Sequence, residues 1–453
     1  MTYNYHQAVD YILQIPRFTS KNDLEETRSF LKDLGNPEEG FWIIHVAGTN
    51  GKGSVCYYCD VLLQAEGKTV GRFTSPHLER INERMVMNGK EIGDEAFLES
   101  FHQILHVVEE RMAKGHPHPT FFEFIFGMAL LAFQREKVEY VVLETGLGGR
   151  LDATNAVAHP MATVITPIGY DHMKQLGNTL GQIAYEKAGI IKEGVPLVFA
   201  STTTASDEVI EARAKALHSP FLKIEKEDLQ IEKVEDNGIA FSIKRDYYGK
   251  GLWTLKTGGV YQPYNALLAL EAVRIVLREM KTKGLTHERV SPADAGGGNP
   301  LSQKQIAKWR QALAKGVWMG RMEEVRPKVY LDGAHNLNAI LGFNESMAYD
   351  ISPKIIVFGA VADKDVEAMV RALAEGLTKS SVERVIVTTV SDSRGVRSEE
   401  LKKLFETYTD RPIVNIENPR EAMSVAIKQQ GERKIYCLGS LYLIGELRRT
   451  LAT

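Results

Sequence analysis

The chain has 453 residues, of which 44% are hydrophobic and 25% are charged, and its formal net charge is -3. These values are typical of a soluble globular protein of two or three domains, and they exclude an electrostatic basis for binding nucleic acid or an anionic membrane. No stretch approaches the roughly 18 uninterrupted apolar residues of a membrane span and the first residues lack an export signal, so we expect a cytoplasmic protein.

The first predicted elements surround a glycine-rich turn. Apolar residues at helical intervals between Tyr5 and Leu34 predict two helices that cover a sheet, and Phe41–Val46 has the pattern of a buried strand. The turn Gly48–Ser54 reads Gly-Thr-Asn-Gly-Lys-Gly-Ser, and the pattern predicts a helix over Val55–Ala65. With a further strand at Thr69–Phe73, this is a βαβ unit, which requires a parallel sheet.

The glycine-rich turn has the features of a phosphate-binding loop. Glycines let backbone N–H groups converge on an anion, the following helix adds the positive end of its dipole, and Lys52 adds a charge for the outer phosphates. The turn departs from the standard nucleotide loop, because Val46 stands where the first glycine is usual and Gly53 stands where Ser or Thr follows the lysine. The hydroxyl comes one residue later, at Ser54. A glycine-rich turn that binds nothing is the alternative.

The predicted helix after this turn carries a C-x-x-C pair, Cys56 and Cys59. Such a pair could indicate redox chemistry or half of a zinc site. No second pair exists, because Cys437 is the only other cysteine. We therefore expect both thiols to be packed in the core.

Polar segments follow three of the predicted strands. Thr69–Phe73 runs into Thr74–Arg84, which holds hydroxyls, a histidine and two arginines and could equally be a charged surface loop. The apolar strand Tyr140–Leu143 ends in Glu144. A carboxylate at the end of a parallel strand beside a phosphate loop has the location of a magnesium ligand, although it could be a solvated acid.

The strand Ala162–Thr166 leads to Asp171 and His172. Such an Asp-His pair is commonly a hydrogen-bonded structural couple. A helix is expected to begin after Asn178 and to continue as far as Lys192.

The remaining predictions for the first half concern the elements around these strands. Thr120–Phe124 opens a helix with an aromatic cluster, which is either core or part of a ligand cradle. Short strands between Leu197 and Gly258, with a turn at Asp236-Asn237-Gly238, predict a small antiparallel appendage. A long helix to about Met280 begins near Gln262 and Asn265, whose amides could contact an adenine or cap the helix. The segment Lys281–Asn299 reads as a flexible insertion that binds nothing.

A second domain is predicted after the helix Gln305–Ala314, with the junction near Lys315–Trp318. Its first strand, Val329–Leu331, ends in Asp332-Gly333-Ala334-His335-Asn336. The later strands and helices alternate as in a doubly wound unit. They are Ile355–Phe358, Val366–Ala374, Val385–Thr388, Ser398–Phe405, Glu421–Gln429 and Ile435–Leu438. No G-x-G-x-x-G follows the first strand, so we do not expect a dinucleotide site.

Several segments together resemble one family. The segments are Gly48–Ser54 with its Gly-Ser ending, Thr120–Phe124, Glu144–Asn155, Glu186–Ile191, Gly320-Arg321, Asp332–Asn336 and Gly439–Leu443. In this order they resemble the folylpolyglutamate and dihydrofolate synthases of the Mur ligase superfamily. The chain differs at Tyr261, where the family normally has His, and at Met319, where it normally has Pro before Gly-Arg.

The resemblance implies an α/β fold of two domains. Residues 1–314 would form a P-loop-type ATPase domain with a parallel sheet, the folate site and the small antiparallel appendage. Residues 317–453 would form a Rossmann-like doubly wound domain. The implied reaction is ATP-dependent formation of an amide between a folate and L-glutamate, through an acyl phosphate.

The resemblance also implies residue roles. Catalytic roles fall to Lys52, His172, Lys187 and Arg321, and Lys187 matches the lysine that is typically carbamylated. ATP would be held by Thr49, Asn50, Gly51, Lys52, Gly53, Ser54, Gln262, Asn265, Arg321, Asp332 and His335. Two Mg²⁺ ions would be held by Ser75, Glu144 and His172. The folate would be contacted by Arg84, Thr120, Phe122 and Asp152.

Two other functions are compatible with parts of the pattern. One is a Mur-type ligase that acts on a cell-wall precursor, and the other is a nucleotide-binding protein without catalysis. The sequence leaves open whether the acceptor is dihydropteroate, tetrahydrofolate or both, and how many glutamates are added. The family's usual form is a monomer with small-molecule partners, ATP, glutamate and folate or pteroate, and with neither nucleic acid nor membrane.

Overall fold

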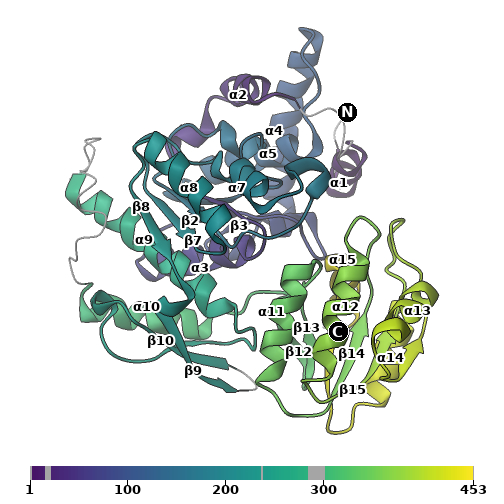
Figure 1. Cartoon of the computed structure of the whole chain (residues 1–453). Helices are drawn as coiled ribbons and strands as arrows, with labels where there is room; N and C mark the ends of the chain where they lie inside the picture. The colour runs from purple at the N-terminus through teal and green to yellow at the C-terminus, as the bar shows by residue number, and fades with distance from the viewer. Residues whose placement is uncertain (1–2, 16–21, 236–237, 284–300, 452–453) are drawn as a thin grey trace.

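The described residues of the computed structural model, 3–15, 22–235, 238–283 and 301–451, form three sheets (Figure 1). The first sheet has eight strands, of which six are parallel and two, β3 and β4, are added antiparallel at one edge. In spatial order its strands are β4 (Lys90–Glu91), β3 (Met85–Met87), β2 (Val70–Phe73), β5 (Tyr140–Glu144), β1 (Trp42–Ala47), β6 (Ala162–Ile165), β7 (Leu197–Ala200) and β8 (Phe221–Ile224).

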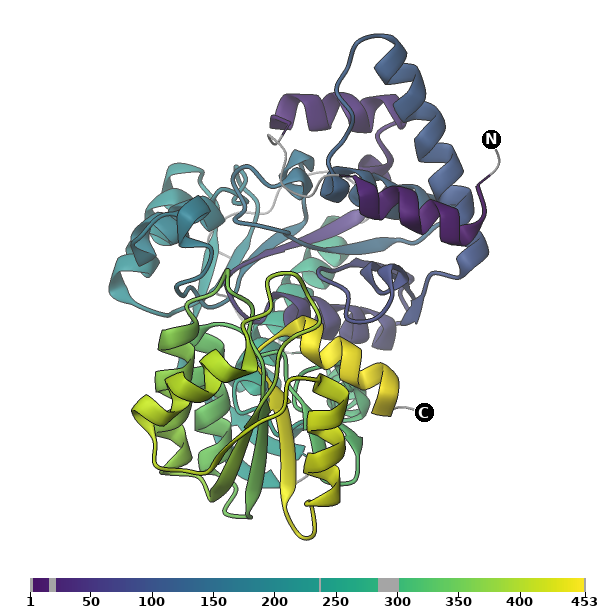
Figure 2. The ribbon, with the colours of Figure 1, turned by 90° about the vertical axis from the view of Figure 1, so that its right-hand side faces the viewer.

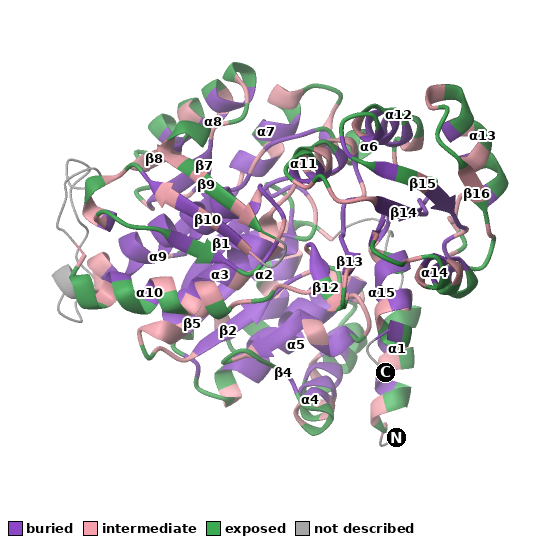
Figure 3. Ribbon diagram, turned by 90° about the horizontal axis from the view of Figure 1, so that it is seen from below, coloured by how far each residue is buried: buried purple, intermediate pink, exposed green. Residues whose placement is uncertain are grey.

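Helices cover both faces of the first sheet. Along β1, Ile44 packs into the cluster that contains α3 and α9, whereas its neighbour Ile43 packs against α4 and α5, because successive side chains of a strand point to opposite faces. The strands are therefore buried between helices whose outer surfaces are exposed (Figure 3). The helices of this half are α1 (Tyr5–Gln14), α2 (Leu24–Asp33), α3 (Lys52–Ala65), α4 (Asp94–Ala113), α5 (Phe121–Arg135), α6 (Met173–Leu176), α7 (Leu180–Ala188), α8 (Thr204–Ala216), α9 (Gln262–Lys283) and α10 (Gln303–Lys315).

The antiparallel appendage is smaller than the sequence predicts. It consists of β11 (Trp253–Leu255), β10 (Gly238–Ile243) and β9 (Leu229–Glu235). The prediction was wrong for Leu197–Asp228, because β7 and β8 continue the parallel sheet and α8 forms the crossover between them. The signal was present in β7, a run of four buried apolar residues that fits a strand covered on both faces.

The third sheet lies in the C-terminal half, drawn in green to yellow in Figure 2. Its strands in spatial order are β12 (Glu323–Arg326), β13 (Val329–Leu331), β17 (Lys434–Leu438), β14 (Lys354–Phe358), β15 (Val382–Val387) and β16 (Ile413–Asn415). All but the edge strand β12 run parallel. One face packs against α11 (Leu337–Ala348), α12 (Val366–Leu377) and α13 (Ser398–Tyr408), and the other against α14 (Pro419–Lys428) and α15 (Leu441–Leu451).

Three smaller predictions can be compared with the structure. The helix expected as far as Lys192 ends at Ala188. Cys56 and Cys59 are fully buried and not bonded to each other, as expected, and burial raises the pKa of both thiols. Of the insertion predicted over Lys281–Asn299, the first three residues belong to the end of α9, while residues 284–299 and the turn residues 236–237 lie outside the described residues. No helix in the described part of the chain is long and apolar enough to cross a membrane.

Candidate active site

The phosphate loop lies where the order of strands in the first sheet reverses. It follows β1, which has β5 on one side and β6 on the other, and ligands of open α/β sheets bind at the carboxyl ends of strands at such a point. Two of its glycines are required by geometry. A Cβ on Gly48, at φ +145°, would lie 1.8 Å from the hydroxyl oxygen of Thr166, and one on Gly51, at φ +90°, would lie 2.3 Å from Oδ1 of Asn265.

The helix after the loop begins at Lys52, three residues earlier than predicted, and has no side-chain cap. The N–H groups of its first turn therefore suit an anion such as a phosphate. Lys52 Nζ donates to the carbonyl oxygen of Thr49 at 3.2 Å. The Thr49 hydroxyl donates to the carbonyl oxygen of Gly169 at 3.0 Å and accepts the Gly169 N–H at 3.0 Å, which ties the loop to the segment after β6.

Gly53, where the loop departs from the standard pattern, lies against the segment between the two halves of the chain. A Cβ at this position would be 3.3 Å from Cζ2 of Trp318 and 3.5 Å from Oε2 of Glu144. Trp318 in turn stacks on Tyr57 of α3, with ring centroids 5.0 Å apart, and lies 4.5 Å from the guanidinium carbon of Arg72. A side chain larger than hydrogen would press on this packing, which gives the glycine a physical reason.

Glu144 is not a solvated acid, because only 4% of it is exposed. The Ser75 N–H donates to its Oε2 at 3.0 Å. Burial raises the pKa of Glu144, while Lys52, the Ser75 N–H, Arg321 and Arg84 lower it. The structure thus brings Ser75, Glu144, Lys52 and Arg321 together at the ends of neighbouring elements.

The chemistry of these donors fits magnesium. Among the described residues, no three His, Cys, Asp or Glu side chains form a group that could hold a metal ion. Mg²⁺ commonly takes one or two carboxylates and completes its coordination with water and substrate phosphates. The oxygens of Ser75 and Glu144 beside a phosphate loop provide such a partial set.

His172 is the first residue before α6 and has a left-handed backbone, φ 50° and ψ 38°. Although 45% of the His172 side chain is exposed, partial desolvation and then the charge of Lys364 lower the pKa of the ring, so the imidazole is neutral at pH 7 and its lone pair can ligate a metal. The ring Nε2 is 3.9 Å from Oδ1 of Asp171, too far for a hydrogen bond, whereas the His172 main-chain N–H donates to that oxygen at 2.9 Å.

Lys187 lies on α7, and its Nζ donates to the carbonyl oxygen of Gly48 at 2.7 Å. Only 4% of the residue is exposed, and burial together with the charge of Lys52 lowers its pKa to about 7. About half of such amines are uncharged at neutral pH, and the uncharged form is the nucleophile that carbamylation needs.

A cleft of about 860 Å³ lies between the two halves. Seven of the residues predicted to hold ATP line it, namely Asn50, Gly51, Ser54, Asn265, Arg321, Asp332 and His335. Burial, and then the charge of Lys364, lowers the pKa of His335 to about 4. Gly333 makes room for Arg321, because a Cβ there would be 2.1 Å from a guanidinium nitrogen.

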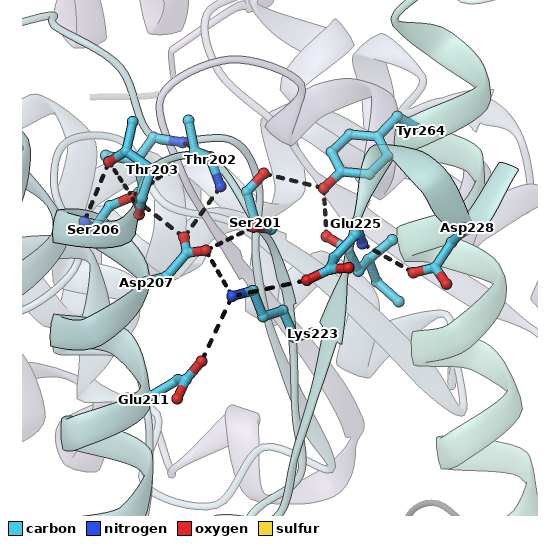
Figure 4. Close-up of polar contacts among 12 residues, drawn as sticks. Ser201, Thr202, Thr203, Ser206, Asp207, Glu211, Lys223, Glu225, Asp228 and Tyr264 are labelled. Carbon is cyan, nitrogen blue, oxygen red and sulfur yellow. Dashed lines mark hydrogen bonds and ion pairs between the residues drawn. The ribbon is translucent and has the colours of Figure 1, made fainter.

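The far end of the cleft was not predicted. Ser201, Thr202, Glu225 and Tyr264 line it, and Figure 4 shows the polar contacts that hold them. The Tyr264 hydroxyl donates to the carbonyl oxygens of Ser201, at 3.2 Å, and Ile224. The carboxylate of Asp207, on α8, accepts the Ser201 hydroxyl at 2.6 Å and the Thr202 N–H at 3.1 Å. The error in assigning Leu197–Asp228 to the appendage is the reason that sequence reasoning missed this wall.

Two predicted ATP contacts are occupied by other protein groups. Gln262 is not part of the cleft wall, and its amide nitrogen donates to the Ser54 hydroxyl at 3.2 Å. Asp332 accepts the hydroxyl of Tyr261 at 2.7 Å and the Met322 N–H at 2.9 Å on the same oxygen. Tyr261, where the resemblance was weakest, thus joins the start of α9 to the end of β13.

The predicted folate residues lie around the start of α5 and the loop after β5. Arg84 Nε donates to Nδ1 of His77 at 2.8 Å, and its guanidinium lies 5.3 Å from the centroid of Phe121. The Thr120 hydroxyl accepts the Glu123 N–H at 3.4 Å and so caps α5. Phe122 packs closely on Gly146, where a Cβ would be 2.8 Å from the ring.

Asp152 differs from these three because its carboxylate serves its own loop. It is 2% exposed, and it accepts hydrogen bonds from the Leu147 N–H at 2.8 Å and from the Thr154 hydroxyl at 2.6 Å and N–H at 3.0 Å. A contact to a substrate would have to use acceptor capacity that remains beside these bonds.

Sequence reasoning also missed the side chains that join the two halves beside the phosphate loop. Asn50 and Asn336 exchange two amide hydrogen bonds, of 3.0 and 2.9 Å, and Lys364 Nζ lies 2.7 Å from Oδ1 of Asp171. The available signal was the charged triplet Asp363-Lys364-Asp365 shortly after a buried parallel strand, since ligand and interface groups concentrate at that end.

Comparison with known protein families gives matches over most of the chain. Residues 46–273 match the Mur ligase middle domain, and residues 320–440 match the Mur ligase glutamate ligase domain. The dihydrofolate synthase/folylpolyglutamate synthase of Bacillus subtilis is 34% identical over 456 aligned residues, covering 99% of each chain.

Solved structures give the same relationship. Folylpolyglutamate synthase of Mycobacterium tuberculosis, complexed with ADP, is 26% identical with a TM-score of 0.83, and the match covers 99% of this chain and 98% of that one. E. coli FolC, in complex with DHPP and ADP, is 26% identical with a TM-score of 0.79, with 99% and 98% covered.

Proposed function

Since the chain belongs to the Mur ligase superfamily, in its folylpolyglutamate and dihydrofolate synthase family, we propose that the cleft between its two halves binds ATP, a folate or pteroate and L-glutamate. The chain is an ATP-dependent, amide-forming ligase. In this reaction ATP activates the carboxylate of the folate and not that of the incoming glutamate. The folate carboxylate attacks the γ-phosphorus of ATP, and the bond from this phosphorus to the bridging oxygen breaks to release ADP. The amine of glutamate then attacks the carbonyl carbon of the acyl phosphate and releases phosphate.

The observation that carries this function is the convergence of two cations, Lys52 of the phosphate loop and Arg321 of the cleft wall, on the buried carboxylate of Glu144. In the first step a carboxylate approaches a polyphosphate, so the site must offset like charges. Lys52 lies in the phosphate loop, and Arg321 lines the opposite wall; both lower the pKa of Glu144, so both are close to it. Magnesium bound by Ser75, Glu144 and His172 would add charge neutralisation at the phosphates.

Lys187 fits the role of a carbamylated lysine. As an ammonium it would repel bound cations beside Lys52, whereas a carbamate is an anion. Its pKa of about 7 leaves enough free amine to react with carbon dioxide at neutral pH. Its hydrogen bond to the carbonyl oxygen of Gly48 means that its amine contacts the first residue of the phosphate loop.

The proposal is tested with purified protein, MgATP and glutamate, combined separately with dihydropteroate, reduced folates and a cell-wall precursor. We expect ADP release that requires glutamate together with a pteroate or folate, and a product heavier by one glutamyl residue in mass spectrometry. ADP release with the cell-wall precursor alone, or ATP binding without any glutamate-dependent turnover, would contradict the assignment. The pteroate and folate arms also decide which acceptor is used.

A further inference from the structure

Asp171 is held by two side chains of the C-terminal half. Lys364 Nζ is 2.7 Å from its Oδ1, and the Asn336 amide nitrogen donates to its Oδ2 at 2.9 Å. The side chains of both charged residues are only 10% exposed. An ion pair shielded from water to this extent is screened by salt much less than a surface pair, and removing one partner leaves the other charge poorly solvated.

Lys364 is directed across the boundary by a turn whose acidic residues are used locally. Asp363 pairs with Arg394 at 3.1 Å, and Asp365 caps α12 by accepting the Ala368 N–H at 3.1 Å. The Ala362 N–H also donates to the carbonyl oxygen of Arg394 at 2.8 Å. The main-chain bond of Ala362 and the cap by Asp365 are enough to fix the turn within its own half, because the exposed Asp363–Arg394 pair contributes little, and Lys364 extends from the turn to Asp171.

Asn336 makes a second connection from the same side. Its Oδ1 caps α11 by accepting the Ala339 N–H at 2.9 Å, and its amide exchanges hydrogen bonds with Asn50 of the phosphate loop. Docking of the C-terminal half therefore holds both the phosphate loop and Asp171.

The segment that Asp171 belongs to carries His172 in a strained conformation. A left-handed backbone is unfavourable for a residue other than glycine and persists only where the surroundings fix it. On its carbonyl side His172 is held by the N–H groups of Gln175 and Leu176 at the start of α6. On its N–H side it is held by Oδ1 of Asp171, which is the oxygen that Lys364 also contacts. Lys364 therefore acts on the position of His172 through one carboxylate oxygen.

We propose that Asp171 and Lys364 form a positioning pair that couples docking of the C-terminal half to the placement of His172 at the metal and phosphate site. Neither side chain is assigned a contact with a substrate. The catalytic part of the inference rests on the proposed function, whereas the effect of Lys364 on the backbone of residues 168–172 does not.

The test compares Lys364→Met and Lys364→Arg with Asp363→Asn as a matched control in the same turn. Hydrogen exchange of the peptide covering residues 168–172 is measured without substrates, and kcat and KM are measured for ATP and glutamate. We expect Lys364→Met to speed exchange of that peptide and to lower kcat about tenfold to a hundredfold, since a group displaced by about 1 Å can cost up to ~10²-fold. Lys364→Arg should retain most of both properties, and Asp363→Asn, which breaks a pair within one half, should leave the exchange unchanged.

A double variant separates this pair from two independent contributions. Asp171→Asn with Lys364→Met should be no worse in kcat than the worse single variant, because both remove one interaction. Multiplying losses, or unchanged exchange at 168–172 in Lys364→Met, would overturn the proposal. A higher KM for glutamate with unchanged exchange would assign Lys364 to substrate binding instead. Since exchange is measured without turnover, failure of the proposed reaction does not affect that result.

Discussion

The first and third sheets are both parallel, but the two use their strand ends differently. In the first, the ends of β1, β2, β5 and β6 bring Lys52, Ser75, Glu144 and His172 towards one point. In the third, the ends of β13 and β14 provide Asn336 and Lys364, which contact the first half instead of forming a site of their own. The first sheet thus carries most of the residues that we propose for catalysis, whereas the third completes the cleft and joins the two halves.

This difference makes Lys52 the position where the largest effect is expected. Replacing Lys52 with Ala removes the cation that we propose to lie beside the outer phosphates of ATP, while the glycine-rich backbone can keep its shape. We expect kcat to fall by about 10²-fold to 10³-fold, the size of the loss when one preorganised charge-stabilising group is removed. Glutamate- and folate-dependent ADP release measures it.

The control for Lys52→Ala is Lys68→Ala. Lys68 lies in the same half and makes a surface pair with Glu139 at 3.8 Å, which is worth little. Turnover by Lys52→Ala close to that of Lys68→Ala would show that the phosphate loop does not carry the catalytic charge, and the contrast between the two sheets would fail.

The difference between the two sheets also explains which site residues could be predicted from the sequence. The phosphate loop begins at the end of β1, Glu144 is the last residue of β5, and His172 lies in the segment that follows β6, so the local pattern placed all three at one edge of the sheet. Asp171 and Lys364 are 193 positions apart, and nothing local specifies their 2.7 Å approach. It arises from docking of the two halves of the chain, which the sequence pattern of either half does not encode.

Errors in the fold have a similar cause. β7 and β8 are short, and short apolar strands look alike whether they continue a parallel sheet or start an antiparallel one. The crossover helix α8, which decides between these two topologies, was not recognised. The wall of the cleft that contains Ser201 and Tyr264 was lost with it.

A second prediction concerns Lys187 of the first half, which should make the free energy of unfolding depend on pH. Its folded-state pKa is lowered to about 7, so between pH 7 and its usual value near 10.5 the unfolded chain holds a proton that the folded chain has released. Raising the pH through this window therefore favours the folded state. Relative to Lys187→Met, the wild type should gain about 1 kcal/mol of unfolding free energy per pH unit between pH 7 and 9.

Urea unfolding of both proteins in buffers free of carbon dioxide measures this difference. Lys192, whose pKa is also lowered, is present in both and cancels. Lys215→Met, which removes an exposed lysine of α8, should show a difference that does not change with pH. A flat difference for Lys187→Met as well would mean that Lys187 is charged in the folded protein, and would remove the reason to expect carbamylation.

The smallest effect is expected at Tyr261, where the two halves meet through one neutral donor. Tyr261→Phe removes the hydroxyl that donates to Asp332 across the boundary, but Asp332 keeps the N–H groups of Met322 and Ala334. A hydrogen bond of this kind contributes about 1 kcal/mol, so we expect the KM for ATP to rise about threefold to tenfold with little change in kcat.

Tyr247→Phe is the matched control, because it removes a bond from a tyrosine to the carboxylate of Glu271 inside the first half. Both variants should lose stability, but only Tyr261→Phe should change the KM for ATP. If the two variants lost stability alike and neither changed that KM, the Tyr261 contact would be packing between the halves and not part of the nucleotide wall.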